Sequence, residues 1–120
     1  SIRIEALRYL AVYRQSMDLP LIESTLRSPK LGSYEPDEIR AWVKCYGIVG
    51  RNESIKLLRQ VLEGTAKLAG PPELIRTLSI EALLTLNTPE SQGALELLGR
   101  KNESMKRQIV KLQAQRKSRR

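Results

Sequence analysis

The chain has no histidine and no phenylalanine, one cysteine, and only 4% aromatic residues among its 120. Without histidine it lacks the side chain that most often serves as an acid–base catalyst near neutral pH and as a metal ligand. A single cysteine, Cys45, excludes a disulfide within the chain and a zinc site built from several cysteines. Because aromatic residues are so few, any hydrophobic core must be mainly aliphatic.

Long hydrophobic runs are also missing, and none approaches the roughly 20 residues that a membrane-spanning helix needs. The chain begins at Ser1, directly on an amphipathic pattern, so we expect a fragment of a longer cytoplasmic protein that is monomeric as a fragment. No glycine-rich phosphate loop or nucleophile elbow occurs, and we expect the acid pair Asp37 and Glu38 to be exposed. The sequence therefore predicts no catalysis, no cofactor and no metal site in this segment, while catalysis elsewhere in a longer protein stays open.

The positive charge is concentrated near the C-terminus. The formal net charge is +8, but residues 1–98 hold 12 basic and 12 acidic residues, whereas 99–120 hold nine basic residues and one acidic residue. We expect residues 113–120 to form a disordered basic tail, although a terminal basic run is more often a solvated helix end than a binding site. The possible anion-binding residues are Arg100, Arg107, Lys111, Arg116, Lys117, Arg119 and Arg120.

A pattern of about 36 residues recurs through the chain. The pair Ile-Arg occurs at residues 2–3, 39–40 and 75–76, and each pair precedes an apolar stretch with helical spacing. Leu26, Leu62 and Leu98 are separated by 36 residues each, and a break containing glycine or proline follows the first two. No segment alternates with a period of two, so the sequence predicts helical hairpins of about 1–35, 36–71 and 72–99, followed by a capping helix over 102–114.

Turn and capping residues agree with these hairpins. Pro36 and Thr88-Pro89 are typical of helix starts, and Asn52 and Asn102 are placed to cap the helices that follow them. Gly99 is expected to adopt the left-handed conformation that closes the third hairpin. A single hairpin cannot bury its own apolar face, so the sequence predicts an all-α, right-handed superhelical solenoid of about three and a half hairpins.

The segments Ile39-Arg40-Ala41 with Tyr46-Gly47-Ile48, and Ile75-Arg76 with Ala82-Leu83-Leu84, resemble the first helices of HEAT repeats. Second helices of this family resemble residues 54–58 and 93–98. Tetratricopeptide repeats compete less well, because their characteristic Trp, Gly-Tyr and Pro positions are not matched. The resemblance implies an α-solenoid over residues 1–112, in which Arg40 and Arg76 form ion pairs with Glu5, Glu38, Glu73 or Glu81 along the stack.

Solenoids of this kind serve many unrelated functions, and the resemblance implies a scaffold that binds a partner protein on a concave surface of second helices. Trp42 lies beside the apolar stripe of its helix, and Tyr34 lies in an acidic loop, so either is a candidate anchor. The partner-binding residues proposed from the sequence are Trp42, Tyr34, Glu23, Lys56, Arg59 and Glu63. Binding of nucleic acid or an anionic surface through the basic tail is the alternative, although no aromatic residue is interleaved there for stacking.

Overall fold

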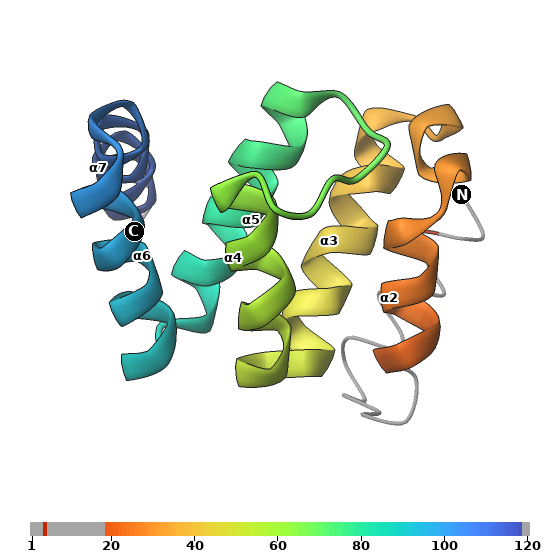
Figure 1. The fold of residues 1–120 in the computed structure, drawn as a ribbon, viewed down its shortest axis with the longest axis horizontal. Coiled ribbons are helices and arrows are strands. Elements are labelled where there is room, and N and C mark those ends of the chain that lie inside the picture. Colours follow the sequence, from red (N-terminus) through yellow and green to blue (C-terminus); the bar gives the residue numbers. More distant parts are fainter. Residues whose placement is uncertain (1–3, 5–18, 119–120) are drawn as a thin grey trace.

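The computed structural model describes Ile4 and residues 19–118, and all of its regular structure is helical (Figure 1). The elements after Ile4 are α2 (Leu19–Arg27), the 3₁₀ helix η2 (Pro29–Ser33), α3 (Pro36–Gly50), the 3₁₀ helix η3 (Arg51–Ser54), α4 (Ile55–Glu63), α5 (Pro72–Leu86), α6 (Pro89–Lys101) and α7 (Glu103–Ser118). Within these residues there is no strand, which confirms the predicted all-α class. The predicted first helix of the chain lies outside the described residues, except for Ile4.

The helices follow one another along the long axis of the molecule, from α2 at one end to α7 at the other (Figure 1). Helix α3 packs on α5, and α5 packs on α7, while α4 packs on α6. Each second helix also contacts the first helix of the next hairpin, through the pairs α2–α3, α4–α5 and α6–α7. Neighbouring hairpins therefore bury their apolar faces against each other.

The 36-residue pattern places equivalent residues at equivalent positions in the second and third hairpins. Helices α3 and α5 are both 15 residues long, and each has a proline in its first turn. Ile39 and Ile75, one turn into these helices, are 1% and 4% exposed. Leu26, Leu62 and Leu98 are all buried on the second helices α2, α4 and α6.

Of the four predicted capping residues named here, two cap their helices and two do not. Thr88 caps α6 by accepting a hydrogen bond from the Ser91 amide at 3.1 Å, and Asn102 Oδ1 accepts one from the Met105 amide, also at 3.1 Å. The predicted cap at Asn52 is wrong, because Ser54 is the N-cap of α4 and the Asn52 side chain bonds to Thr88 and Glu90 of the third hairpin. The prediction for Gly99 is also wrong, since it lies within α6 and allows Lys106 of α7 to approach closely.

The last helix continues beyond its predicted end. Helix α7 extends to Ser118, so the expectation of a capping helix ending at 114 and a disordered tail from 113 is wrong for 113–118. Arg116 is half-buried and bonds to α5, which gives this last turn a tertiary anchor. Arg119 and Arg120 lie outside the described residues.

The described core is aliphatic apart from Tyr46, which is 1% exposed. Burial raises the pKa of the Tyr46 phenol, and the nearby Glu23 carboxylate, which accepts its hydrogen bond, raises it further. Cys45 is buried and forms no disulfide, since it is the chain's one cysteine. Glu38 is 4% exposed, contrary to the expectation that the acid pair at this helix start is solvated, whereas Asp37 is exposed.

Candidate functional site

A groove of about 1000 Å³ lies where α3, α5 and α7 meet. Its walls come from residues three or four positions apart, because such residues share one face of a helix. From α3 and the residue after it come Arg40, Lys44, Gly47, Ile48 and Arg51; from α5 come Leu78, Glu81, Ala82 and Thr85; and from α7 come Leu112, Gln115 and Arg116. We call this the first-helix groove, since α3 and α5 are the first helices of their hairpins and α7 is the next helix after the third hairpin.

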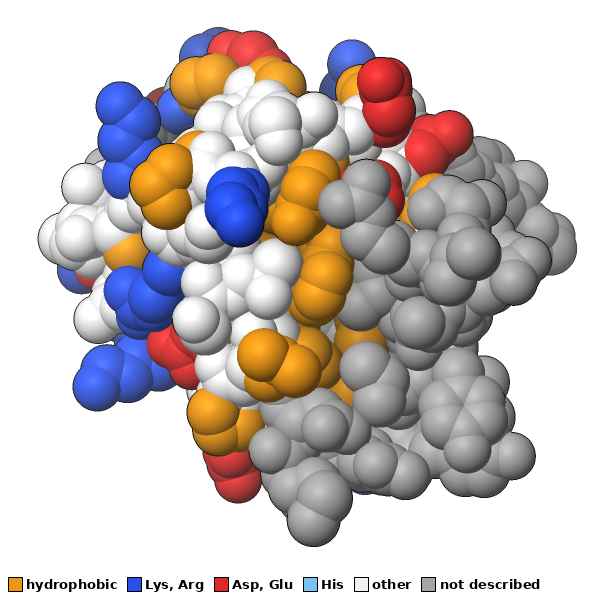
Figure 2. All heavy atoms as spheres, turned by 90° about the vertical axis from the view of Figure 1, so that its right-hand side faces the viewer, with side chains coloured by type: hydrophobic (Ala, Val, Ile, Leu, Met, Phe, Trp, Pro, Cys, Tyr) orange, Lys and Arg blue, Asp and Glu red, His pale blue; other side chains and the backbone are white. Residues whose placement is uncertain are grey.

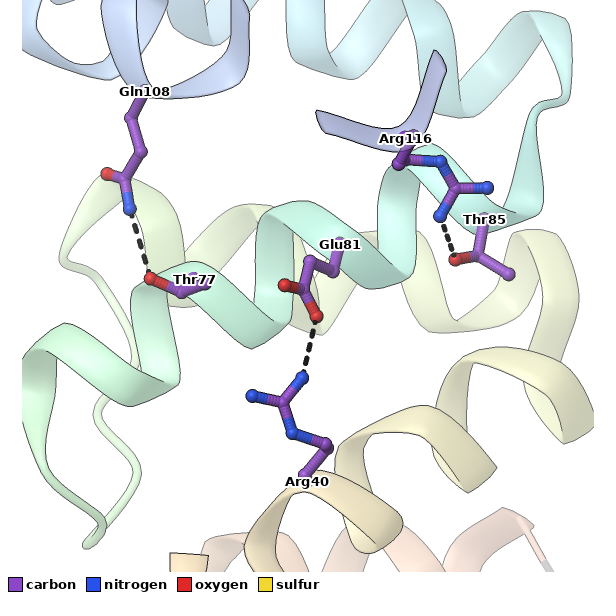
Figure 3. A network of polar contacts seen from close by, with 6 residues as sticks. All are labelled: Arg40, Thr77, Glu81, Thr85, Gln108 and Arg116. Carbon is purple, nitrogen blue, oxygen red and sulfur yellow. Dashed lines mark hydrogen bonds and ion pairs between the residues drawn. The ribbon is translucent and has the colours of Figure 1, made fainter. Parts of the chain in front are cut away.

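Polar contacts join the three helices along this side of the molecule (Figure 3). Arg40 Nη1 of α3 lies 3.1 Å from Glu81 Oε2 of α5. Arg116 Nη1 of α7 donates to Thr85 Oγ1 at 2.9 Å, and Gln108 Nε2 donates to Thr77 Oγ1 at 3.1 Å. The predicted ion pair between hairpins is thus present for Arg40, and these contacts fix the positions of two side chains that line the groove, Arg40 and Arg116.

The first-helix groove has an excess of positive charge. Among the described residues that line it, Arg40, Lys44, Arg51 and Arg116 are basic, and Glu53 and Glu81 are acidic. Glu81 pairs with Arg40, and Arg116 bonds to the neutral Thr85. Within the same described set, the cations without an ion pair therefore outnumber the one carboxylate left, Glu53. Its floor is apolar, with Leu78, Ala82 and Leu112 buried below the polar rim.

Arg51 has an unusual backbone at the edge of this groove. Its φ of 48° and ψ of −127° place it in a region that a residue with a Cβ atom rarely adopts. The residue ends α3, and its amide donates to the Gly47 carbonyl. Strained residues of this kind often occur at functional sites, where the surrounding structure holds them in place.

A second groove, of about 850 Å³, lies between α6, α7 and the C-terminal end of α5. Arg100, Arg116 and Lys117 line it, together with Leu95 and Val110. Arg100 already pairs with Glu96 of its own helix. The possible anion-binding residues are therefore dispersed, since Arg107 and Lys111 are exposed on α7 and line neither groove.

The second helices carry their charges mostly as internal pairs. Glu23 accepts from Arg27 at 3.0 Å on α2, and Glu63 pairs with Arg59 at 3.2 Å on α4. Lys56 is exposed on α4. None of the predicted residues Glu23, Lys56, Arg59 and Glu63 lines either groove.

The two aromatic anchors proposed from the sequence also lie outside both grooves. Trp42 and Tyr34 are each partly buried and pack against the hydrophobic core. The Trp42 indole nitrogen is buried without a hydrogen-bond partner. Both rings therefore contribute to packing within the fold.

Apolar side chains also reach the surface at the α2 end of the molecule. Figure 2 shows a band of hydrophobic side chains on this face. Leu21 of α2 is 65% exposed. This end differs from the first-helix groove, where the apolar floor lies beneath a polar rim.

Sequence reasoning overlooked Lys44, Arg51 and Thr85 as groove residues. A signal was present for the first two, because residues 40, 44, 47 and 51 follow a three-to-four spacing on one flank of α3. Thr85 also follows Glu81 by four residues on one flank of α5, but only the packing of α7 against α5 places this flank at the groove. In the part of the chain that the structure describes, no helix is both long and apolar enough to cross a membrane, and no group of three metal-ligating residues occurs.

Comparisons with known proteins found no family model, no curated protein and no solved structure that matches this chain.

Proposed function

We propose that this chain is a non-catalytic protein-binding module, built as a HEAT-like solenoid of helical hairpins, whose partner protein occupies the first-helix groove. The observation that carries this proposal is the groove itself, with an apolar floor and a polar rim formed by α3, α5 and α7. A concave site of this composition is the usual form of a recognition site, because apolar contacts give affinity and a few polar groups set orientation.

The recurring register supports the solenoid part of the proposal. Equivalent residues of the second and third hairpins are equally buried, and each second helix packs on the next first helix. Stacked hairpins bury a continuous core while leaving one flank of each helix free for a partner. Such a module acts by shape, and we propose scaffolding within a larger protein as its role.

The place of binding differs from the one that the resemblance implies. Most charges on α2 and α4 are held in pairs within each helix, with Lys56 as the exception, whereas Lys44 and Arg51 are exposed beside an apolar floor. Forming a contact with a paired charge first requires breaking its pair. We therefore favour the first-helix side over the second-helix side as the binding surface.

Anion binding through the C-terminal helix is a second candidate. Lys106, Arg107, Lys111 and Lys117 are exposed on α7, and Glu103 is the only acidic residue of this helix. Affinity for a polyanion at this surface would fall steeply with salt. We rank this function second, because α7 offers no aromatic side chain for stacking on bases.

A display selection with random peptides on the folded chain tests the protein-binding function. The affinity of the selected peptides is then measured for two variants. Thr85→Trp fills the first-helix groove, and Lys56→Trp places the same side chain on the exposed surface of α4. We expect binding to be lost with Thr85→Trp and kept with Lys56→Trp. The reverse pattern would place the partner on the second helices, and a selection without any enriched peptide would contradict the function.

A further inference from the structure

We infer that the ligand of the first-helix groove is an acidic segment of a partner protein that carries aliphatic side chains among its carboxylates. This inference rests on the proposed function and specifies the chemistry of its partner.

The positive charge of the rim favours an acidic segment as the ligand. Lys44 and Arg51 are both exposed, and the structure gives no ion pair to either within the described residues. Among the described residues of the rim, Glu53 is the one carboxylate that is not paired with Arg40. A basic segment would meet this excess of like charge, whereas an acidic segment would neutralise it.

The floor of the groove selects aliphatic side chains. Leu78, Ala82 and Leu112 are buried there, and Ile48 and Leu86 are half-buried at the walls. Among the described residues that line the groove none is aromatic, so these residues offer no stacking surface for a nucleobase. The same cations would attract a nucleic-acid backbone, but the apolar floor would then stay unused, which favours a peptide.

Arg51 adds an independent observation. Its strained backbone holds an arginine where glycine would be relaxed, and the side chain lines the groove. A guanidinium forms two parallel hydrogen bonds with a carboxylate, which a lysine cannot do. The strain and the charge therefore fit one role, in which Arg51 is the principal carboxylate contact.

Fluorescence anisotropy with four labelled probes tests the inference on the folded chain. The probes are a Glu-rich peptide with leucines spaced four residues apart, the same peptide with serine for leucine, the same peptide with lysine for glutamate, and a single-stranded RNA. We expect the first peptide to bind at least about tenfold more tightly than the second and third, and to weaken as salt rises to about 0.3 M.

Two double variants with equal changes in charge locate the binding. Lys44→Glu with Arg51→Glu reverses two positive charges at the rim. Arg107→Glu with Lys111→Glu reverses two exposed positive charges that line neither groove. We expect the first pair to weaken the acidic peptide by about tenfold or more and the second pair by less than about twofold. Circular dichroism establishes that both variants are folded, and the neutral pair Lys44→Gln with Arg51→Gln should give an intermediate loss.

Several results would overturn the inference. One is equal binding of the acidic and basic peptides, or no binding of the acidic one. Another is an equal loss of affinity in both double variants, and a third is RNA that binds at the rim and is not displaced by the acidic peptide. If the display selection enriches peptides of another composition that still require an open groove, the protein-binding function stands and the acidic specificity fails.

Discussion

Asn52 and Thr88 are 36 residues apart in the sequence and bond to each other across two neighbouring hairpins. Thr88 Oγ1 donates to Asn52 Oδ1 at 2.8 Å, and Asn52 Nδ2 donates to Glu90 Oε2 at 3.2 Å. The two residues are equivalent in the repeat, since each precedes the second helix of its hairpin. This contact therefore fixes the register of one hairpin against the next.

A double-mutant cycle with Asn52→Ala and Thr88→Ala should reveal this contact. We expect each single variant to lower the free energy of unfolding by about 1 kcal/mol, and the pair to show a coupling energy of about 1 kcal/mol. Urea denaturation measures the free energy of unfolding of the wild type, the two single variants and the double variant. Strictly additive losses would mean that Asn52 and Thr88 do not stabilise the fold through each other.

The same residues show what the sequence reveals and what it does not. Burial of Ile39 and Ile75 was predictable, because apolar periodicity and a 36-residue spacing are properties of the sequence. The role of Asn52 was not, since an asparagine before a helix suits either a local cap or a bond to a neighbour. The position of Thr88 in space decides between them.

The site was less predictable than the fold for a related reason. The spacing of Arg40 and Lys44 shows that they share a flank of one helix, but not which helix faces that flank. Only the packing of α5 and α7 turns the flank into a groove. Likewise Arg116 resembles one more residue of a basic tail, and only the structure shows that α7 extends past it and that it bonds to Thr85.

Gly32 and Gly93 make a matched pair for testing the loop packing. A Cβ atom added at Gly32 would lie 2.6 Å from the Ala69 carbonyl oxygen, whereas one added at Gly93 would meet nothing within 4 Å. We expect Gly32→Ala to destabilise by about 1–3 kcal/mol, because the two loops between hairpins would have to separate. Gly93→Ala, within α6, should instead stabilise by about 0.5–1 kcal/mol, because alanine favours a helix. Equal melting temperatures for the two variants would contradict this packing.

Arg51→Gly should stabilise the protein while weakening its binding. Glycine adopts a φ of 48° with ψ of −127° without a Cβ clash, so we expect a gain of about 1 kcal/mol in the free energy of unfolding. Thermal unfolding measures the gain in stability, and fluorescence anisotropy with the acidic peptide measures the loss of affinity. Arg51→Ala is the control, since it removes the guanidinium but keeps the Cβ atom, and should weaken binding without raising stability. A melting temperature that rises equally in both variants would show that the side chain, and not the backbone, is the source of strain.

Tyr46 should make the stability of the fold sensitive to alkaline pH. Its pKa is raised in the native state, chiefly because burial disfavours the phenolate and also because the Glu23 carboxylate repels it. Unfolding releases the phenol to titrate near its ordinary pKa of about 10, so the unfolded state binds fewer protons above that pH. The contribution of Tyr46 is therefore complete below about pH 10 and is lost as pH rises toward the native pKa, at about 1.4 kcal/mol per pH unit.

Urea denaturation of wild type and Tyr46→Phe between about pH 9 and 11 measures this dependence. We expect the phenylalanine variant to lose less stability across the range, because it has no phenol to ionise on unfolding. Parallel curves for wild type and Tyr46→Phe would mean that the Tyr46 hydroxyl titrates equally in both states, which would contradict a raised native pKa.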